Sequence, residues 1–275
     1  MTLALGERFR LHAMAFGLSY RPSIVIRQHT LTDVSLADLA DGGLMPYEVA
    51  QFLDAAILAR KSMVISGDQG AGKTTLLRAL INSIPLNERF GTLETDYELM
   101  THLQPGRENI LAPAGARRSW RDAPAAAGSA TSPSPSWCRR HLRQNLSRLV
   151  IGEVRGGEAS AMFEAMQAGT GTLSTTHSHS AESTMDRLAS RVAQGGVLDR
   201  SKRRYRQIAH NIHLFVYVKL VDETWKGGTR RRYISEIRQV SRAIEHGRPV
   251  THLTYHATGT AEPTSRLLSR GRLRS

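Results

Sequence analysis

Residues 67–74 read GDQGAGKT and match the pattern G-x-x-x-x-G-K-[ST] at every fixed position. Glycines let such a loop curl until its backbone N–H groups face phosphate oxygens at a helix N-terminus. The ammonium of Lys73 would reach the β- and γ-phosphates, and the hydroxyl of Thr74 would ligate Mg²⁺. A chance match arises on the order of once per hundred such chains. The predicted nucleotide-binding residues are Gly67, Asp68, Gln69, Gly70, Ala71, Gly72, Lys73, Thr74 and Thr75.

Carboxylate and imidazole side chains stand at the ends of three further apolar runs. Glu94 and Glu98 lie just past the run FGTL. Glu153 follows LVIG, and His177 follows TLSTT. Ligands of open α/β sheets bind at the carboxyl ends of the strands, so we expect these side chains to converge on the phosphate-binding loop. Taken alone, Glu153 also suits a helix-capping acid, and His177 suits a structural histidine.

The elements that must hold these residues alternate between helix and strand patterns. Apolar residues at three- and four-residue spacing predict helices, and short apolar runs predict strands. The predicted helices span 46–61, 74–84, 158–168 and 181–193. The predicted strands span 23–28, 62–66, 90–94, 148–153 and 171–177, followed by antiparallel strands at 213–221, 231–240 and 250–257 with a turn at Gly227-Gly228. This order indicates an α/β fold with a mostly parallel sheet and right-handed crossovers.

Three motifs beyond the glycine-rich loop resemble one family. Residues 149–189 contain Gly152-Glu153 where a Walker B strand usually has Asp-Glu, and V-R-G-G-E-A follows. TLETDYEL resembles an acidic box, and Ser174–His177 resembles the end of a histidine box. Together these motifs resemble the traffic ATPases of type II and type IV secretion systems, in the CpaF-like branch that assembles Flp/Tad pili. The resemblance covers roughly residues 8–255, with one gap.

The resemblance implies a RecA-like P-loop NTPase core that uses ATP and Mg²⁺. Thr74 and Glu153 would hold the metal ion and its waters, and Glu98 would polarise the attacking water. His177 would sense the γ-phosphate, and Arg155 would brace the loop after Glu153 beside the nucleotide. The chemistry expected of such a site is positioning and electrostatic stabilisation of an in-line transfer to water.

The chain departs from the family pattern at three places. Thr95 stands where the acidic box has its second acid, and Thr170 stands where the histidine box often has an earlier histidine. Family members carry an N-terminal domain that closes over the nucleotide with arginines, whereas only about 40 residues precede the core here. Arg21 and Arg27 resemble the end of that domain. We therefore expect a truncated N-terminal domain.

The resemblance implies an ATP-hydrolysing motor subunit of a secretion or pilus-assembly machine. Such a subunit would form a homo-hexamer, lie in the cytoplasm against the inner face of the cytoplasmic membrane, and push an inner-membrane platform protein. Two alternatives stay open at this point. One is an impaired, truncated or frame-shifted remnant that binds ATP without hydrolysing it, and the other is a nucleic-acid translocase with a RecA-like core.

Composition argues against nucleic acid as the main partner. The net charge is +13, but +12 of it lies in three short segments, 112–141, 198–206 and 266–275, so a broad basic face is not expected. Apolar runs are only a few residues long, which predicts no membrane span. The first ten residues do not have the pattern of a secretory signal. The single cysteine, Cys138, fits a reducing compartment.

Residues 112–141 contain no Leu, Ile, Val, Met, Phe or Tyr. The family resemblance stops where this segment begins, and Arg, Ala, Pro, Gly and Ser all have GC-rich codons. We interpret the segment as the product of a shifted reading frame, with a flexible insertion as the alternative, and expect no packed structure in either case. The stretch 198–206 and the C-terminal tail share its basic composition. The predicted organisation is an N-terminal remnant and linker at 1–42, an ATPase domain at 43–265 and a disordered basic tail at 266–275.

Overall fold

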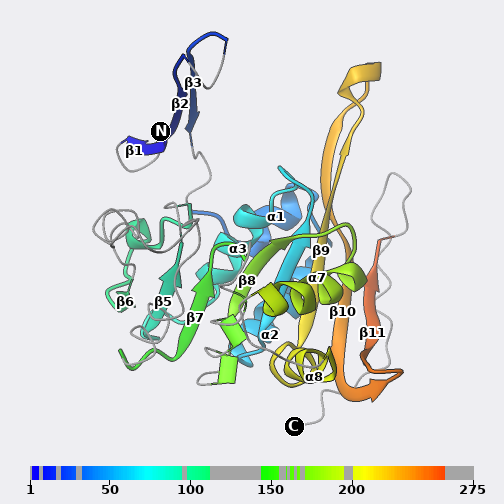
Figure 1. Ribbon diagram of the computed structural model, residues 1–275. Helices are drawn as coiled ribbons and strands as arrows, with labels where there is room; N and C mark the ends of the chain where they lie inside the picture. The colour runs from blue at the N-terminus through cyan, green and yellow to red at the C-terminus, as the bar shows by residue number, and fades with distance from the viewer. Residues whose placement is uncertain are drawn as a thin grey trace.

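Eight strands form one sheet, and six of them are parallel to one another. The computed structural model describes residues 2–5, 9–16, 20–28, 33–94, 98–111, 144–154, 171–194 and 201–257, with five helical positions between 159 and 167. The strand order is β11-β10-β9-β4-β8-β7-β5-β6, and only β10 and β11 run antiparallel to their neighbours. The strands are β4 (Met63–Gly67), β5 (Phe90–Leu93), β6 (Ile110–Leu111), β7 (Arg148–Ile151), β8 (Leu173–His177), β9 (Leu214–Asp222), β10 (Arg230–Glu245) and β11 (Arg248–His256). The predicted α/β class is confirmed (Figure 1).

Helices cover both faces of this sheet (Figure 1). They are α1 (Leu36–Asp41), α2 (Tyr47–Leu58), α3 (Lys73–Asn82), α7 (Ala181–Gln194) and α8 (Ser201–Asn211), with short 3₁₀ turns at Thr101–Leu103 and Thr224–Lys226. Strand β4 is buried throughout, with Met63 and Ile65 in the apolar cluster of α1–α3 and Val64 in that of α7 and α8. This alternation follows from the two-residue period of a strand. The core therefore lies in two layers, and β4 separates them.

A second, three-stranded antiparallel sheet precedes the core. It consists of β1 (Thr2–Leu5), β2 (Phe9–Met14) and β3 (Ser23–Gln28), and it stands apart from the eight-stranded sheet in Figure 1. The sequence pattern predicted only the last of these strands. Ile24, Val25 and Ile26 are all more than half exposed, so this sheet keeps apolar side chains on its surface.

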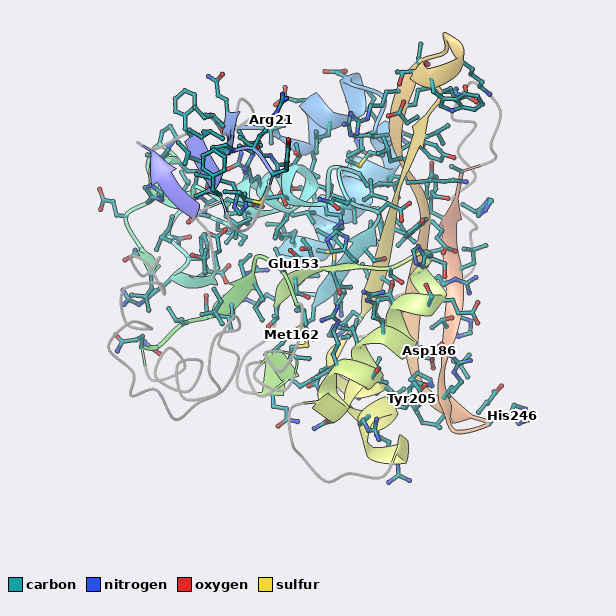
Figure 2. All side chains as sticks on the ribbon, turned by 45° about the horizontal axis from the view of Figure 1, so that its top comes forward. Arg21, Glu153, Met162, Asp186, Tyr205 and His246 are labelled. Carbon is teal, nitrogen blue, oxygen red and sulfur yellow. The ribbon has the colours of Figure 1, made fainter. Side chains whose placement is uncertain are left out.

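Helix α8 corrects the reading of the basic stretch 198–206. Its composition resembles that of 112–141, yet residues 201–211 form a helix that buries Ile208 in the core. The hydroxyl of Tyr205 donates to Asp186 Oδ1 of α7 at 2.8 Å, and Arg248 of β11 binds the same carboxylate. Figure 2 shows Asp186 and Tyr205 side by side. Arg204 of this helix is half-buried and donates from Nη1 to the carbonyl oxygen of Ala189 on α7 at 3.3 Å. Charge counting missed the helix because net charge does not distinguish a packed amphipathic helix from an unfolded basic segment.

Other predicted boundaries shift by a few residues. Pro46 is the N-cap of α2 rather than part of its first turn, and α1 was not predicted at all. The turn at Gly227 is present, with a φ of +79°. The segment 112–141 and the tail 266–275 lie outside the described residues. Among the residues that the structure describes, no helix is long and apolar enough to cross a membrane.

Among the described glycines, Gly67, the last residue of β4, leaves the least room for a side chain. A Cβ there would lie 2.2 Å from the carbonyl oxygen of Val218 on β9, and φ is +152°. We expect Gly67→Ala to lower the free energy of unfolding by about 2 kcal/mol or more beyond the control Gly247→Ala. Gly247 shares the positive φ, at +80°, but a Cβ there would meet nothing within 4 Å. Urea titrations of both variants measure the difference, and equal losses would show that backbone conformation alone requires the glycine.

Candidate active site

The glycine-rich loop joins the carboxyl end of β4 to the first residue of α3. Gly70 and Gly72 have φ values of +74° and +97°, and Gly72 is the N-cap of α3. Left-handed conformations of this kind favour glycine and turn the loop above the helix N-terminus. Ala71 is fully buried in the hydrophobic core and anchors the loop to it. The loop therefore brings backbone N–H groups and the positive end of the helix dipole to one point.

Lys73, His177 and Glu153 form a continuous chain of polar contacts beside this loop. The ammonium of Lys73 donates to the carbonyl oxygens of Gly67 and Asp68 at 2.9 and 2.7 Å. Its Nζ lies 3.2 Å from Nδ1 of His177, and Nε2 of His177 lies 3.1 Å from Oε1 of Glu153. An ammonium only donates, so Nδ1 accepts, and we assign the imidazole proton to Nε2, which donates to Glu153.

Burial lowers the pKa of Lys73, and the nearby carboxylates of Glu153 and Asp68 offset part of that effect. Lys73 is only 7% exposed, so its ammonium is shielded from much of the surrounding water. Electrostatic interactions are stronger in such an environment. A phosphate that reaches the loop thus meets a desolvated cation and a row of N–H donors.

Hydrogen bonds to β8 fix the backbone on either side of Glu153. The N–H of Val154 donates to the Thr175 carbonyl at 2.8 Å, and the hydroxyl of Thr176 donates to the Val154 carbonyl at 3.1 Å. The hydroxyl of Thr175 donates to the carbonyl of Gly152. In Figure 2, Glu153 lies centrally, just beyond the end of β7. The Gly-Glu signature is therefore tied to the strand that carries His177.

Two glutamates follow β5, and they differ in their surroundings. Glu98 faces a cavity, while its backbone carbonyl accepts a hydrogen bond from Nε of Arg78 at 2.7 Å. Oε1 of Glu94 accepts hydrogen bonds from the N–H groups of Glu98 and Leu99 at 3.0 and 2.8 Å. Desolvation raises the pKa of Glu94 to about 8, against the effect of these two N–H groups.

One cavity of about 1450 Å³ contains most of the predicted site. The predicted residues that line it are Gln69, Gly70, Gly72, Lys73, Thr74, Thr75, Glu98, Glu153 and His177. Gly67, Asp68 and Ala71 support the loop and are not part of the lining. Arg155 lies outside the described residues. The structure thus places side chains from the ends of β4, β7 and β8, and from the segment after β5, around one space.

Arginines from distant segments also line the cavity, and sequence motifs alone did not point to two of them. Nε of Arg232 on β10 donates to the carbonyl oxygen of Gly70 at 2.8 Å, and Arg230 lies beside the same glycine. Arg27 of β3, which in sequence resembles the end of the family's N-terminal domain, lines the cavity as well. No local pattern marks Arg232, because its partner lies 162 residues away.

The oxygen donors around the cavity fit Mg²⁺. No group of three or more His, Cys, Asp or Glu side chains suited to a metal ion occurs in the described part of the chain. Mg²⁺ bound to a nucleotide needs only one or two protein ligands, because phosphate oxygens and waters supply the others. The hydroxyl of Thr74 and the carboxylate of Glu153 both line the cavity and are oxygen ligands of that kind.

The raised pKa of Glu94 predicts a pH-dependent contribution to stability. Between about pH 4.5 and 8 the folded chain holds a proton that the unfolded chain has released, so this contribution falls as pH rises. We expect the unfolding free energy of the parent, relative to Glu94→Gln, to fall by up to about 1.4 kcal/mol per pH unit in that range. Urea titrations at several pH values measure this difference. Parallel profiles for the two proteins would contradict the assignment.

The chain is similar to known proteins over most of its length. A family model described as "Type II/IV secretion system protein" matches residues 1–230. The chain is 29% identical over 264 residues to the type IV secretion system protein VirB11 of Brucella suis, covering 86% of this chain and 69% of that protein. It is 37% identical over 138 residues to PtlH of Bordetella pertussis, covering 50% of this chain and 38% of that protein.

Solved structures share the fold. The crystal structure of the VirB11 ATPase of Brucella suis, in complex with sulphate, superposes with a TM-score of 0.57 at 24% identity, covering 87% of this chain and 73% of that one. The Legionella pneumophila ATPase DotB gives a TM-score of 0.55 at 20% identity, covering 90% and 57%. The predicted enzyme class, an ATPase of secretion or pilus machines, is confirmed for the family. The CpaF-like branch is not distinguished by these likenesses. The chain belongs to the type II/IV secretion system protein family.

Proposed function

We propose that this chain binds ATP on residues 67–75 and hydrolyses it as the motor subunit of a secretion or pilus-assembly machine. The observation that carries the proposal is the chain of contacts from Lys73 through His177 to Glu153. It joins the phosphate-binding loop to a carboxylate on a neighbouring strand, in the cavity that Glu98 also lines. A remnant that only binds ATP would have no need for these three groups to converge, so the geometry favours hydrolysis.

The proposed reaction is transfer of the γ-phosphoryl group to water, which depends on positioning and electrostatics. The loop N–H groups and Lys73 would hold the phosphates, and Glu98 would orient and polarise the attacking water. His177 lies between Lys73 and Glu153, so a movement of the ammonium toward phosphate would alter the hydrogen bonding of Glu153. This arrangement suits His177 to sensing the γ-phosphate.

Thr74 and Glu153 are the proposed ligands of Mg²⁺. When bound, the ion would neutralise charge that develops on the phosphate oxygens. The Glu153 carboxylate already accepts a hydrogen bond from His177, which orients it. Arg155 is proposed to brace the segment after Glu153.

We further propose a homo-hexamer that works in the cytoplasm, at the inner face of the cytoplasmic membrane, against a platform protein of that membrane. Family membership and the cavity-lining position of Arg27 support this, because an arginine from the N-terminal sheet reaches the nucleotide side of the core. A division into an N-terminal segment at 1–42, an ATPase domain at 43–265 and a basic tail at 266–275 belongs to the same proposal. The Gly152-Glu153 signature favours the CpaF-like branch.

Substitutions at the loop and at Glu153 should separate binding from hydrolysis. We expect Lys73→Ala to abolish ATP binding, because it removes the buried cation from the phosphates. We expect Glu153→Gln to bind ATP with nearly parental affinity but to stop turnover, since it removes the metal-organising charge. Calorimetric titration measures binding, and phosphate release measures turnover. Equal ATP affinity of Lys73→Ala and the parent would overturn the assignment of the loop.

Arg232 should contribute to nucleotide affinity through Gly70. Loss of its hydrogen bond would free the apex of the loop, and such a bond contributes about 1 kcal/mol. We expect Arg232→Gln to weaken ATP binding by about fivefold. Arg242→Gln is the matched control, because Arg242 lies on the same strand and is exposed. Equal affinities in the two variants would show that the Gly70 contact has no part in binding.

A further inference from the structure

We propose that Glu94 is a positioning residue that holds Glu98 toward the nucleotide cavity, and that Gly152 is a glycine because Glu94 occupies the space of a side chain there. The inference rests on the proposed function for the role of Glu98. It assigns different tasks to the two glutamates that follow β5. Glu98 would act on water, whereas Glu94 would act on the backbone of Glu98.

The backbone of Glu98 is held from both sides. Its N–H donates to Oε1 of Glu94 at 3.0 Å, and its carbonyl accepts from Nε of Arg78 at 2.7 Å. Glu94 Oε1 also accepts from the N–H of Leu99 at 2.8 Å. Leu99 is fully buried in the core. One oxygen of Glu94 therefore accepts from two successive N–H groups and fixes the backbone from which the Glu98 side chain extends.

Glycine at position 152 makes this arrangement possible. A Cβ at Gly152 would lie 3.2 Å from Cγ and 3.4 Å from Oε1 of Glu94. Gly152 cannot move away easily, because its N–H donates to the carbonyl of Leu93 at 2.9 Å and its carbonyl accepts from Thr175. Most Walker B strands carry an aspartate before the glutamate, and that side chain would meet Glu94 here. The glycine of the Gly-Glu signature and the first glutamate of the acidic box therefore pack against each other, and the side chain of Glu94 requires the glycine at position 152.

The surroundings of Glu94 argue against direct chemistry by its carboxylate. Glu94 is not among the residues that line the cavity, whereas Glu98, Glu153 and His177 are. Oε1 is already committed to two N–H groups. An amide oxygen at the same place could accept both hydrogen bonds, so the positioning role does not require a negative charge.

Four variants test the proposal, with ATP turnover measured as kcat and KM. Because a 1 Å misplacement can cost about 100-fold, we expect Glu94→Ala to lower kcat by about 10- to 100-fold while KM changes less than about threefold. Glu94→Gln should restore kcat to within about threefold of the parent, since its amide oxygen keeps both contacts. Gly152→Ala should lower kcat about tenfold by displacing Glu94. In the double variant Glu94→Ala/Gly152→Ala, the second substitution should cost almost nothing further.

Two results would overturn the proposal: Glu94→Gln as slow as Glu94→Ala, which indicates chemistry by the carboxylate, or additive effects of the two alanine substitutions. Glu108→Ala, at an exposed glutamate, is the control for truncation of a glutamate side chain. Amide hydrogen exchange at Glu98 and Leu99 gives a readout independent of turnover. Exchange should be faster in Glu94→Ala and close to parental in Glu94→Gln. If the parent shows no turnover that depends on Lys73, the proposed function fails, and the exchange rates still decide the role of Glu94.

Discussion

The ammonium of Lys73 is the group around which the site is built. A buried cation needs partners for its three N–H bonds, because burial of an unpaired charge costs far more than a hydrogen bond returns. Two partners are loop carbonyls, and the third is the ring of His177 on β8. In the parallel register of β4 and β8, Gly67 lies opposite His177. The position of one charge therefore depends on correct pairing of two strands that are over 100 residues apart in the chain.

The hydrophobic layers hold that pairing in place. Strand β4 is buried on both faces, with Met63 and Ile65 on one and Val64 on the other, so its register with β8 and β9 has little freedom to slip. Helix α3 begins at Lys73 and packs Leu76, Leu77 and Leu80 into one of these layers. The packed helix fixes the direction of its own N-terminus. Rigid packing thus supplies the preorganised dipoles and donors that phosphate chemistry requires.

Groups that lie far apart in the sequence meet at the rim of this site. Arg27 comes from the N-terminal sheet and Arg232 from the long strand β10, whose hairpin with β9 extends away from the core in Figure 1. Arg232 donates directly to the carbonyl oxygen of Gly70, so a displacement of the hairpin would break or strain this hydrogen bond to the phosphate-binding loop. The contact therefore links an extended element directly to the glycine-rich loop.

Sequence by itself determined the loop 67–75, the alternation of strands and helices, and the strand-end residues Glu98, Glu153 and His177. These features are local: glycine spacing, apolar periodicity and a residue's place at the end of a run are all readable within a short window.

Tertiary structure alone decided which other residues contact these groups. It bound the Glu94 side chain to backbone N–H groups while Glu98 lines the cavity, paired His177 with both Lys73 and Glu153, and brought Arg232 to Gly70. It also placed the basic residues after 200 on a packed helix, which composition did not reveal. Such contacts join segments whose distance in the chain is large, so they depend on strand order and register, and no short stretch of sequence carries that information.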